Sequence, residues 1–319
     1  MKTYKILFKI NSSVITPLQA DTFFGCICWA IRYLYGESSL VEFLETYKEE
    51  PPIILSDGYP EGFISKPILK PITYDKVVIL AEDLFGKSRK SLMDCILKIK
   101  KLRKIKYLHI SDFENLKENL SEFTLLKLLL NKEQTQPKIF STLVFRNTIN
   151  RKTNTVLLEG GLHPSEETFY TTNINIFLKT EFRPEKLKTI FEYICLSGFG
   201  RSASSGKGAM EFISIEETKL PLSKNPNAFM SLSCFIPKKT DPQKGYYQIF
   251  TKYGKLGGDY ARSRNPFKKP LLMFTSGSVF IDNPVKEYYG GLVEKVCDNS
   301  NIKHYAYAFP IGVKLDENI

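Results

Sequence analysis

The chain has 319 residues, of which 43% are hydrophobic and 25% are charged, so it is long enough for two domains with cores of their own. That hydrophobic fraction argues against broad disorder. The net charge of +11 favours a polyanionic partner, with a membrane surface as the competing interpretation. No apolar run is long enough to cross a bilayer and no amino-terminal signal pattern is present, so we expect a cytoplasmic protein without membrane contact.

Metal-ligating residues are few and scattered. The sequence has six cysteines, of which only Cys26 and Cys28 are close together, and a single C-x-C without a second cluster is a poor zinc signal. The three histidines, His109, His163 and His304, lie far apart. We therefore expect reduced, buried thiols, no metal and no cofactor.

The first elements are a strand and a helix. Residues 4–14 alternate between apolar and polar side chains, which predicts a strand. A helix is predicted to follow, with Pro17 or Asp21 marking its start and Gly36 as its stop. Gly25 in mid-helix costs stability relative to alanine, so it indicates a close packing contact.

The next segment is basic. Residues 88–106 have an apolar stripe at helical spacing and eight Lys or Arg residues, which predicts an amphipathic helix. The basic face is either a solvated surface or part of an insert that faces RNA or a partner. Residues 114–130 are predicted to continue as helix.

Polar and basic residues at 145–155 predict a protruding hairpin, with Asn154 favouring the turn. The guanidinium groups of its arginines are suited to binding phosphate, which favours contact with RNA. The alternative is an exposed hairpin that carries only surface charge. The candidate RNA contacts here are Arg146, Asn147, Asn150, Arg151 and Thr153. A strand over residues 169–177 and a helix that begins at Pro184 are predicted to follow.

A loop rich in glycine, serine and basic residues spans positions 198–208, between that helix and a strand predicted from residue 210. Glycines permit positive φ, and successive amides, hydroxyls and cations in such a loop suit a phosphate. The order of helix, loop and strand excludes an NTPase P-loop and a dinucleotide fingerprint, leaving a flexible surface turn as the alternative. The candidate contacts are Gly198, Gly200, Arg201, Ser202, Ser204, Ser205, Gly206, Lys207 and Gly208.

The second half is predicted to consist mainly of strands. A polar, proline-bearing linker at 217–227 precedes a strand at 229–236, and residues 304–311 alternate in aromatics as core residues would. Lys252 and Lys255 lie beside flexible glycines and either contact RNA or solvate the loop. The first 220 residues follow the order β-α-insert-β-β-α-β, which is ferredoxin-like with a long insertion.

The loop at 198–208 resembles the glycine-rich loop of the RAMP superfamily of CRISPR–Cas systems, which lies between the second helix and last strand of a ferredoxin-like (RRM-like) domain. Other blocks resemble one RAMP subunit of the type III-A (Csm) effector complex, the fourth by name, which caps the 5′ end of the guide RNA. Three residues depart from the family: Cys26, where it often has histidine, and Asn150 and Asn154, where its I-D-R-x-T-G-T pattern has Asp and Gly. The matching blocks are 16–25, 29–37, 56–60, 66–67, 145–155, 246–258, 265–273, 277–280 and 304–311.

The resemblance implies an α+β fold of two ferredoxin-like domains in tandem. The first would span 1–220, with a helical insertion and a protruding hairpin at about 75–165, and the second 221–319. It also implies a non-catalytic, CRISPR-associated RNA-binding subunit in antiviral defence. Such a subunit would hold the repeat-derived 5′ handle of the crRNA and join the large polymerase-like subunit to the backbone RAMP subunits. Gln19, within the first matching block, joins the candidate RNA contacts.

Two alternatives stay open. The chain could be a metal-independent endoribonuclease that processes guide-RNA precursors, with His163 or His304 as general base, although a lone histidine is more often structural. It could also be a protein-only scaffold whose basic charge serves acidic partner surfaces.

Overall fold

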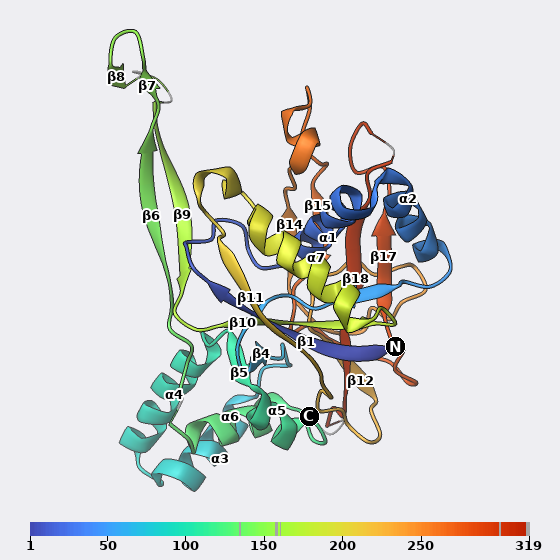
Figure 1. The fold of residues 1–319 in the computed structure, drawn as a ribbon. Coiled ribbons are helices and arrows are strands. Elements are labelled where there is room, and N and C mark those ends of the chain that lie inside the picture. Colours follow the sequence, from blue (N-terminus) through green and yellow to red (C-terminus); the bar gives the residue numbers. More distant parts are fainter. Residues whose placement is uncertain (134, 157–158, 160, 300, 317–319) are drawn as a thin grey trace.

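The structure, a computed structural model, describes residues 1–133, 135–156, 159, 161–299 and 301–316. It is an α+β fold built on antiparallel sheets, which confirms the expected fold class at that level. Figure 1 shows a central sheet with its helices, a lobe of helices below it, a hairpin that rises away from both, and, in orange and red, the strands of the second half.

The central sheet has the strand order β11-β1-β10-β2, and β3 also pairs with β10. Its strands are β1 (Lys2–Ile10), β2 (Ile53–Leu55), β3 (Tyr59–Pro60), β10 (Ile174–Thr180) and β11 (Met210–Glu217). Two helices, α1 (Ala20–Tyr35) and α7 (Pro184–Ser197), pack against each other over this sheet. Phe8 of β1 contacts Phe23 of α1 and Phe191 of α7, at ring-centroid distances of 6.3 and 5.7 Å.

The predicted boundaries of α1 and α7 hold. Gly36 ends α1 with a φ of +93°, and Pro184 lies in the first turn of α7. Gly25 does not mark a close contact, because a Cβ built there meets nothing within 4 Å. Gly25 is half-buried, and the space beside it is open.

The insertion begins with the helical lobe. After α1 come α2 (Glu37–Glu45) and η1 (Thr46–Lys48), and the lobe itself contains β4 (Phe63–Ser65), α3 (Tyr74–Phe85), α4 (Arg89–Arg103), β5 (Tyr107–His109), α5 (Ile110–Leu116) and α6 (Glu122–Leu130). The prediction of one helix over 114–130 was wrong. The chain leaves the helix after Leu116, and Ser121 starts α6 with a capping box to Thr124.

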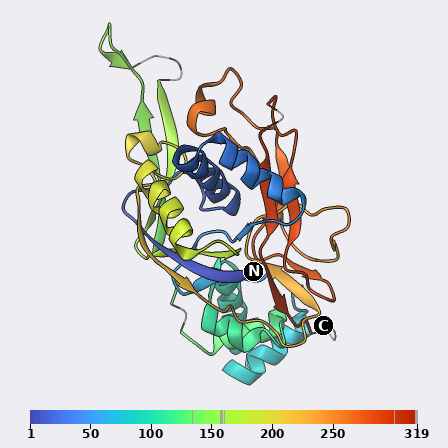
Figure 2. The same ribbon diagram turned by 45° about the vertical axis from the view of Figure 1, so that its right-hand side comes forward.

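The protruding hairpin is confirmed. Its strands are β6 (Ile139–Asn147) and β9 (Leu162–Tyr170), and β7 (Ile149–Asn150) and β8 (Thr155–Val156) form its tip. Figures 1 and 2 both show it standing clear of the other elements. Asn154 has a φ of +53°, the conformation that glycine would adopt at this position, so the expected turn is present.

The strand predicted over residues 169–177 was also wrong. These residues belong to two strands, because β9 ends at Tyr170 and β10 begins at Ile174. The polar stretch 171–173 between them turns the chain from the hairpin into the central sheet. Three consecutive polar residues here interrupt the alternation of side chains, and they were the available signal of the break.

The second half contains strands and one short helix among its described residues. The strands are β12 (Ala228–Ser231), β13 (Gly245–Tyr246), β14 (Ile249–Lys252), β15 (Leu271–Phe274), β16 (Val279–Ile281), β17 (Tyr289–Val293), β18 (His304–Ala308) and β19 (Pro310–Val313), and the helix is the 3-10 turn η3 (Gly258–Arg262). One sheet has the order β13-β16-β12-β19, while β14 pairs with β15 and β17 with β18.

A second ferredoxin-like domain is therefore not confirmed. That motif needs two helices, and residues 221–299 and 301–316 contain no α-helix. Across the described ranges, no helix is both long and apolar enough to cross a membrane.

The two halves share one apolar core. Tyr305 of β18 lies 4.9 Å from the ring of Phe24 in α1, and its hydroxyl accepts a hydrogen bond from the Leu55 amide at 2.8 Å. Tyr59 donates its hydroxyl to the Leu232 carbonyl at 2.5 Å. The domain boundary at residue 220 stays a prediction. Buried residues from both sides of it belong to one hydrophobic cluster, so the core does not mark a boundary there.

We predict that Tyr305→Phe lowers the free energy of unfolding by about 1–3 kcal/mol, because the buried Leu55 amide loses its acceptor. Tyr253→Phe is the matched control, since Tyr253 is 77% exposed. Chemical denaturation of both variants measures the difference. Equal stabilities would show that this bond between the halves contributes nothing.

Candidate nucleic-acid interface

The glycine-rich loop, residues 198–208, has a fixed backbone. Gly198, Gly200, Gly206 and Gly208 all have positive φ. A Cβ at Gly208 would lie 2.0 Å from the Phe199 carbonyl oxygen, and one at Gly200 would lie 2.6 Å from the Thr16 side chain. Glycine is needed at these two positions for close approach as well as for φ.

Most amides of this loop already donate within the protein. Phe199 N–H bonds the Gly208 carbonyl at 2.9 Å, Gly208 N–H bonds the Ser13 carbonyl at 2.9 Å, and Arg201 N–H bonds the Thr16 hydroxyl at 2.8 Å. In the described part of the chain, the amides of residues 202–204 make no well-aligned hydrogen bond. Any backbone recognition of an anion by this loop is thus limited to that short run, beside η2 (Ala203–Ser205).

One buried carboxylate connects the loop to the hairpin. Glu167 of β9 is fully buried, and its two oxygens accept from Lys207 Nζ at 2.7 Å, Ser13 Oγ at 2.5 Å and Arg146 Nη2 at 2.6 Å. The Lys207 hydrogen bond, with those from Ser13 and Arg146, lowers the pKa of Glu167 to about 2. The carboxylate is therefore ionised at neutral pH and binds two cations at once.

Backbone bonds reinforce the same junction. Val14 N–H donates to the Thr168 carbonyl at 2.8 Å, and Thr168 N–H donates to the Val14 carbonyl at 2.9 Å. Ser12 Oγ accepts from Ala209 N–H at 2.9 Å. The segment from Ser12 to Thr16 thus contacts both the base of the hairpin and the glycine-rich loop.

The hairpin has two unlike faces. Register pairs Arg146 with His163 and places Glu167 on the same face, toward the loop. The opposite face exposes Leu143, Phe145 and Leu162. At the tip, Arg151 and Thr153 are exposed, and Asn150 accepts from the Lys152 amide through its side-chain oxygen at 2.9 Å.

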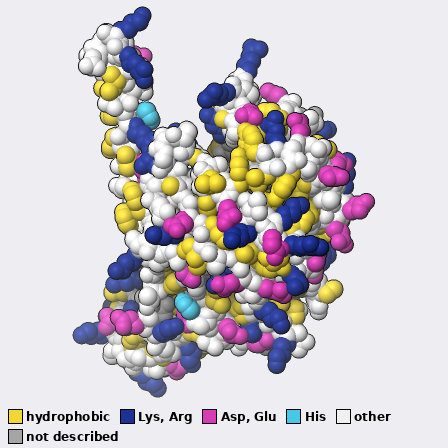
Figure 3. All heavy atoms as spheres, in the orientation of Figure 1, with side chains coloured by type: hydrophobic (Ala, Val, Ile, Leu, Met, Phe, Trp, Pro, Cys, Tyr) yellow, Lys and Arg dark blue, Asp and Glu magenta, His cyan; other side chains and the backbone are white. Residues whose placement is uncertain are grey.

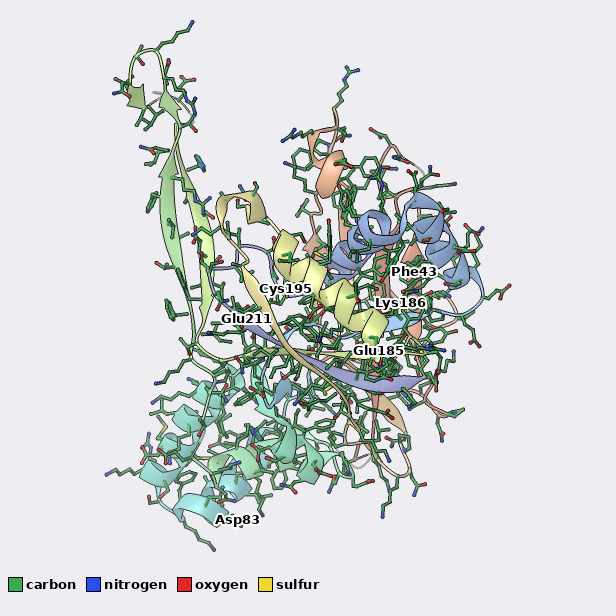
Figure 4. The ribbon with its side chains drawn as sticks, viewed as in Figure 1. Phe43, Asp83, Glu185, Lys186, Cys195 and Glu211 are labelled. Carbon is green, nitrogen blue, oxygen red and sulfur yellow. The ribbon has the colours of Figure 1, made fainter. Side chains whose placement is uncertain are left out.

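Lys and Arg side chains gather at the hairpin tip in Figure 3, which also shows a hollow between the hairpin and the rest of this face. In Figure 4, Glu185 and Lys186 mark the start of α7, while Cys195 marks the end that leads to the loop and Glu211 lies on β11 beyond it. Phe43 and Asp83 lie far from the loop, on α2 and α3.

The remaining candidates lie elsewhere. Lys252 is only 14% exposed, is hydrogen-bonded to Gln19 and forms an ion pair with Asp21 at 3.1 Å. Gln19 in turn donates to Cys234 Sγ at 3.3 Å. The structure thus brings Gln19 and Lys252 together, but as a contact between α1 and β14. Lys255 is exposed beside Phe267 and is not part of this contact.

The histidines differ in access. His304 is 2% exposed, and burial lowers its pKa to about 4, against the opposing effect of Asp21. His163 is exposed on β9. Among the described residues, no group of three or more potential ligands could hold a metal ion.

Sequence reasoning missed Glu167, Ser13 and Thr16. Glu167 follows a second acid, Glu166, and nothing in the sequence around the pair indicates that one of the two is buried. Its partners are 154 residues away at Ser13, 40 at Lys207 and 21 at Arg146. A predicted hairpin register would have placed it on the face of Arg146, which is the one available signal.

No family model matches the chain, and comparison with curated proteins gives no match. Solved structures do match along the whole length. A chain in a crystal structure of a Csm1–Csm4 cassette in complex with AMPPNP is 18% identical, with a TM-score of 0.59 over 99% of this chain and 100% of that one. A chain in a crystal structure of a Csm3–Csm4 subcomplex from the type III-A CRISPR–Cas interference complex is 16% identical, with a TM-score of 0.59 over 98% and 100%.

The same cassette in complex with cA4 gives 19% identity and a TM-score of 0.56 over 98% and 99%. Csm4 is the component that all three assemblies share. The fold of this chain is therefore Csm4-like over its full length, as the resemblance of its sequence to the fourth Csm subunit predicted.

We predict that Glu167→Gln lowers the free energy of unfolding at neutral pH by about 1–3 kcal/mol, because Lys207 and Arg146 lose their shared charge partner. The folded-state pKa lies below the ordinary value of 4.5, so the stabilisation is complete above pH 4.5 and is lost as pH falls through about 2. The stability difference between wild type and variant should shrink over that window in denaturant titrations.

Glu166→Gln, at the exposed neighbouring position, is the matched control and should leave stability unchanged. A difference for Glu167→Gln that stays constant down to pH 2 would contradict the charged network.

We also predict that Gly208→Ala is more destabilising than Gly206→Ala. Both glycines have positive φ, so each substitution costs about 1 kcal/mol of backbone strain. At Gly206 the new Cβ meets nothing within 4 Å, whereas at Gly208 it overlaps the Phe199 carbonyl, which adds about 1–3 kcal/mol or more. Thermal or denaturant unfolding compares the two variants. Similar losses at both positions would show that the loop rearranges freely.

Proposed function

We propose that this chain is a non-catalytic RNA-binding subunit of a type III-A CRISPR–Cas effector complex that holds the repeat-derived 5′ handle of the crRNA. The observation that carries the proposal is the Glu167 network, which joins the glycine-rich loop to the hairpin, the two segments predicted to contact RNA. The Csm4-like fold supports the class of complex.

Lys207 and Arg146 can still bind a phosphate, although both pair with Glu167. Glu167 neutralises one of the two charges of Lys207 and Arg146, whose side chains are still 27% and 29% exposed. Arg201 is exposed nearby in the loop. Its guanidinium group can donate two parallel hydrogen bonds to one phosphate. A backbone phosphate bound here would therefore meet a net positive site on a rigid support.

The hairpin would act at the next position along the strand. Arg151 at its tip is exposed and can bind phosphate, and Phe145 offers an aromatic face on which a base can stack. The proposal is that the hairpin pins or splays the handle where it meets the spacer.

The partners follow from the assemblies in which the similar folds occur. Csm4 occurs there with Csm1 and with Csm3. We propose that this chain likewise joins a large polymerase-like subunit to a backbone RAMP subunit, in the cytoplasm. A second ferredoxin-like domain after residue 220, reduced to its strands, remains part of the proposal.

The endoribonuclease alternative now depends on His163. His304 is buried away from solvent, whereas His163 is exposed beside Arg146 on the hairpin. A precursor-cleavage assay with the purified chain and with His163→Ala decides between the two functions. Cleavage that disappears in the variant would establish the enzyme, and our proposal expects no cleavage by either protein.

We predict that Arg151→Ala/Arg201→Ala weakens binding of a handle-containing RNA and lowers the magnitude of its salt slope by about 0.7 for each phosphate that the variant no longer neutralises. Arg89→Ala/Arg183→Ala removes the same charge from two exposed positions away from the junction and should leave the slope unchanged. Fluorescence anisotropy over a salt series measures both. Identical slopes for the two double variants would contradict the proposed phosphate contacts.

A further inference from the structure

A second site adjoins the glycine-rich loop. A cleft of about 790 Å³ lies between the segment from Val14 to Gln19, the base of the hairpin at Ile139 and Tyr170, and the end of the helical lobe from Lys101 to Tyr107. Figure 1 shows the lobe directly beneath the base of the hairpin. The cleft is thus an open one, bordered by three parts of the molecule that lie far apart in sequence.

The rim of this cleft is positive. Lys101, Lys104 and Lys106 line it, all three are exposed, and none forms a side-chain ion pair with a described residue. Two acids also line the cleft. Asp57 is 6% exposed and accepts the Ala20 amide at 2.8 Å, so it serves the start of α1, and Glu166 is exposed on the hairpin. Three unpaired lysines therefore face one solvated carboxylate.

The inner wall is aromatic. Tyr107 and Tyr170 line the cleft and are each half-buried, and Tyr59 behind them lies edge-on to Tyr107 with ring centroids 6.5 Å apart. Tyrosine rings supply flat apolar faces, and bases stack on such faces regardless of sequence. Lysines around a pocket with an aromatic wall match the charge and shape of a nucleotide.

The cleft and the glycine-rich loop share a wall. Thr16 lines the cleft, while its hydroxyl accepts the Arg201 amide of the loop at 2.8 Å. A Cβ at Gly200 would overlap the Thr16 side chain, so loop and wall are in direct contact. A strand that leaves the loop needs to cross only this wall to enter the cleft.

We propose that this cleft is a nucleotide-binding subsite that extends the RNA site of the loop toward the helical lobe. Phosphates bind Lys101, Lys104 and Lys106, and one base stacks against the tyrosines. The inference rests on the proposed RNA-binding function and assigns part of that function to the lobe, whose basic helix was open to either a solvated or an RNA-facing interpretation.

The test compares two triple variants of the full chain. Lys101→Ala/Lys104→Ala/Lys106→Ala removes the cleft lysines, and Lys87→Ala/Lys90→Ala/Lys100→Ala removes equal charge from exposed positions of the same lobe outside the cleft. The probe is a handle-containing single-stranded RNA, titrated over a salt series. We expect the cleft variant alone to lower the salt slope by about 0.7 per lysine, roughly 2 in total. A photo-crosslink from wild type should map to Tyr107 or Tyr170.

Each outcome decides one point. If wild type binds the RNA and the two triple variants have equal slopes, the cleft proposal is overturned and the proposed function stands. If wild type does not bind the RNA at all, the proposed function fails. A parallel titration with ATP separates a free nucleotide from a strand. The RNA assignment would be overturned by two results together. ATP would bind saturably and only the cleft variant would lose that binding, while the two triple variants would have equal salt slopes for RNA.

Discussion

A single buried carboxylate holds the proposed RNA-binding surface together. A two-stranded hairpin is marginally stable by itself in water, and β6–β9 extends well beyond the central sheet. Glu167 anchors it through Lys207, Arg146 and Ser13. Burying one charge is costly, and removing its partners costs more, so this junction resists rearrangement. The loop and hairpin therefore keep a fixed relation to each other.

The short segment after β1, residues 12–16, contacts the glycine-rich loop, the hairpin and the cleft. Ser13 and Thr16 bind the glycine-rich loop, Val14 pairs with Thr168 of the hairpin, and Thr16 also lines the cleft. The glycine-rich loop, the hairpin and the cleft thus all contact one strand-to-helix connection. The shared core beneath it, with Tyr305 packed on Phe24, fixes the second half against the same helix.

Local chemistry was enough to predict part of this from the sequence. Gly36 and Pro184 delimit helices through φ and a missing donor, Asn154 makes a turn, and the loop at 198–208 needs glycine where backbone meets backbone. Long-range contacts were not predictable. Lys207 and Arg146 looked like free phosphate ligands because their shared carboxylate is distant in the chain, and Lys252 looked exposed because Asp21 is 231 residues away. The break at 171–173 was missed although three consecutive polar residues mark it in the sequence.

The central claim is that loop and hairpin grip the handle together, and crosslinking tests it most directly. The complete complex would be crosslinked to guide RNA labelled at its 5′ end, and the adduct peptides of this chain mapped. We expect adducts in residues 198–208 and 146–155, both at handle nucleotides. Adducts confined to other parts of the chain, or none on this chain, would contradict the account and favour a scaffold that contacts proteins alone.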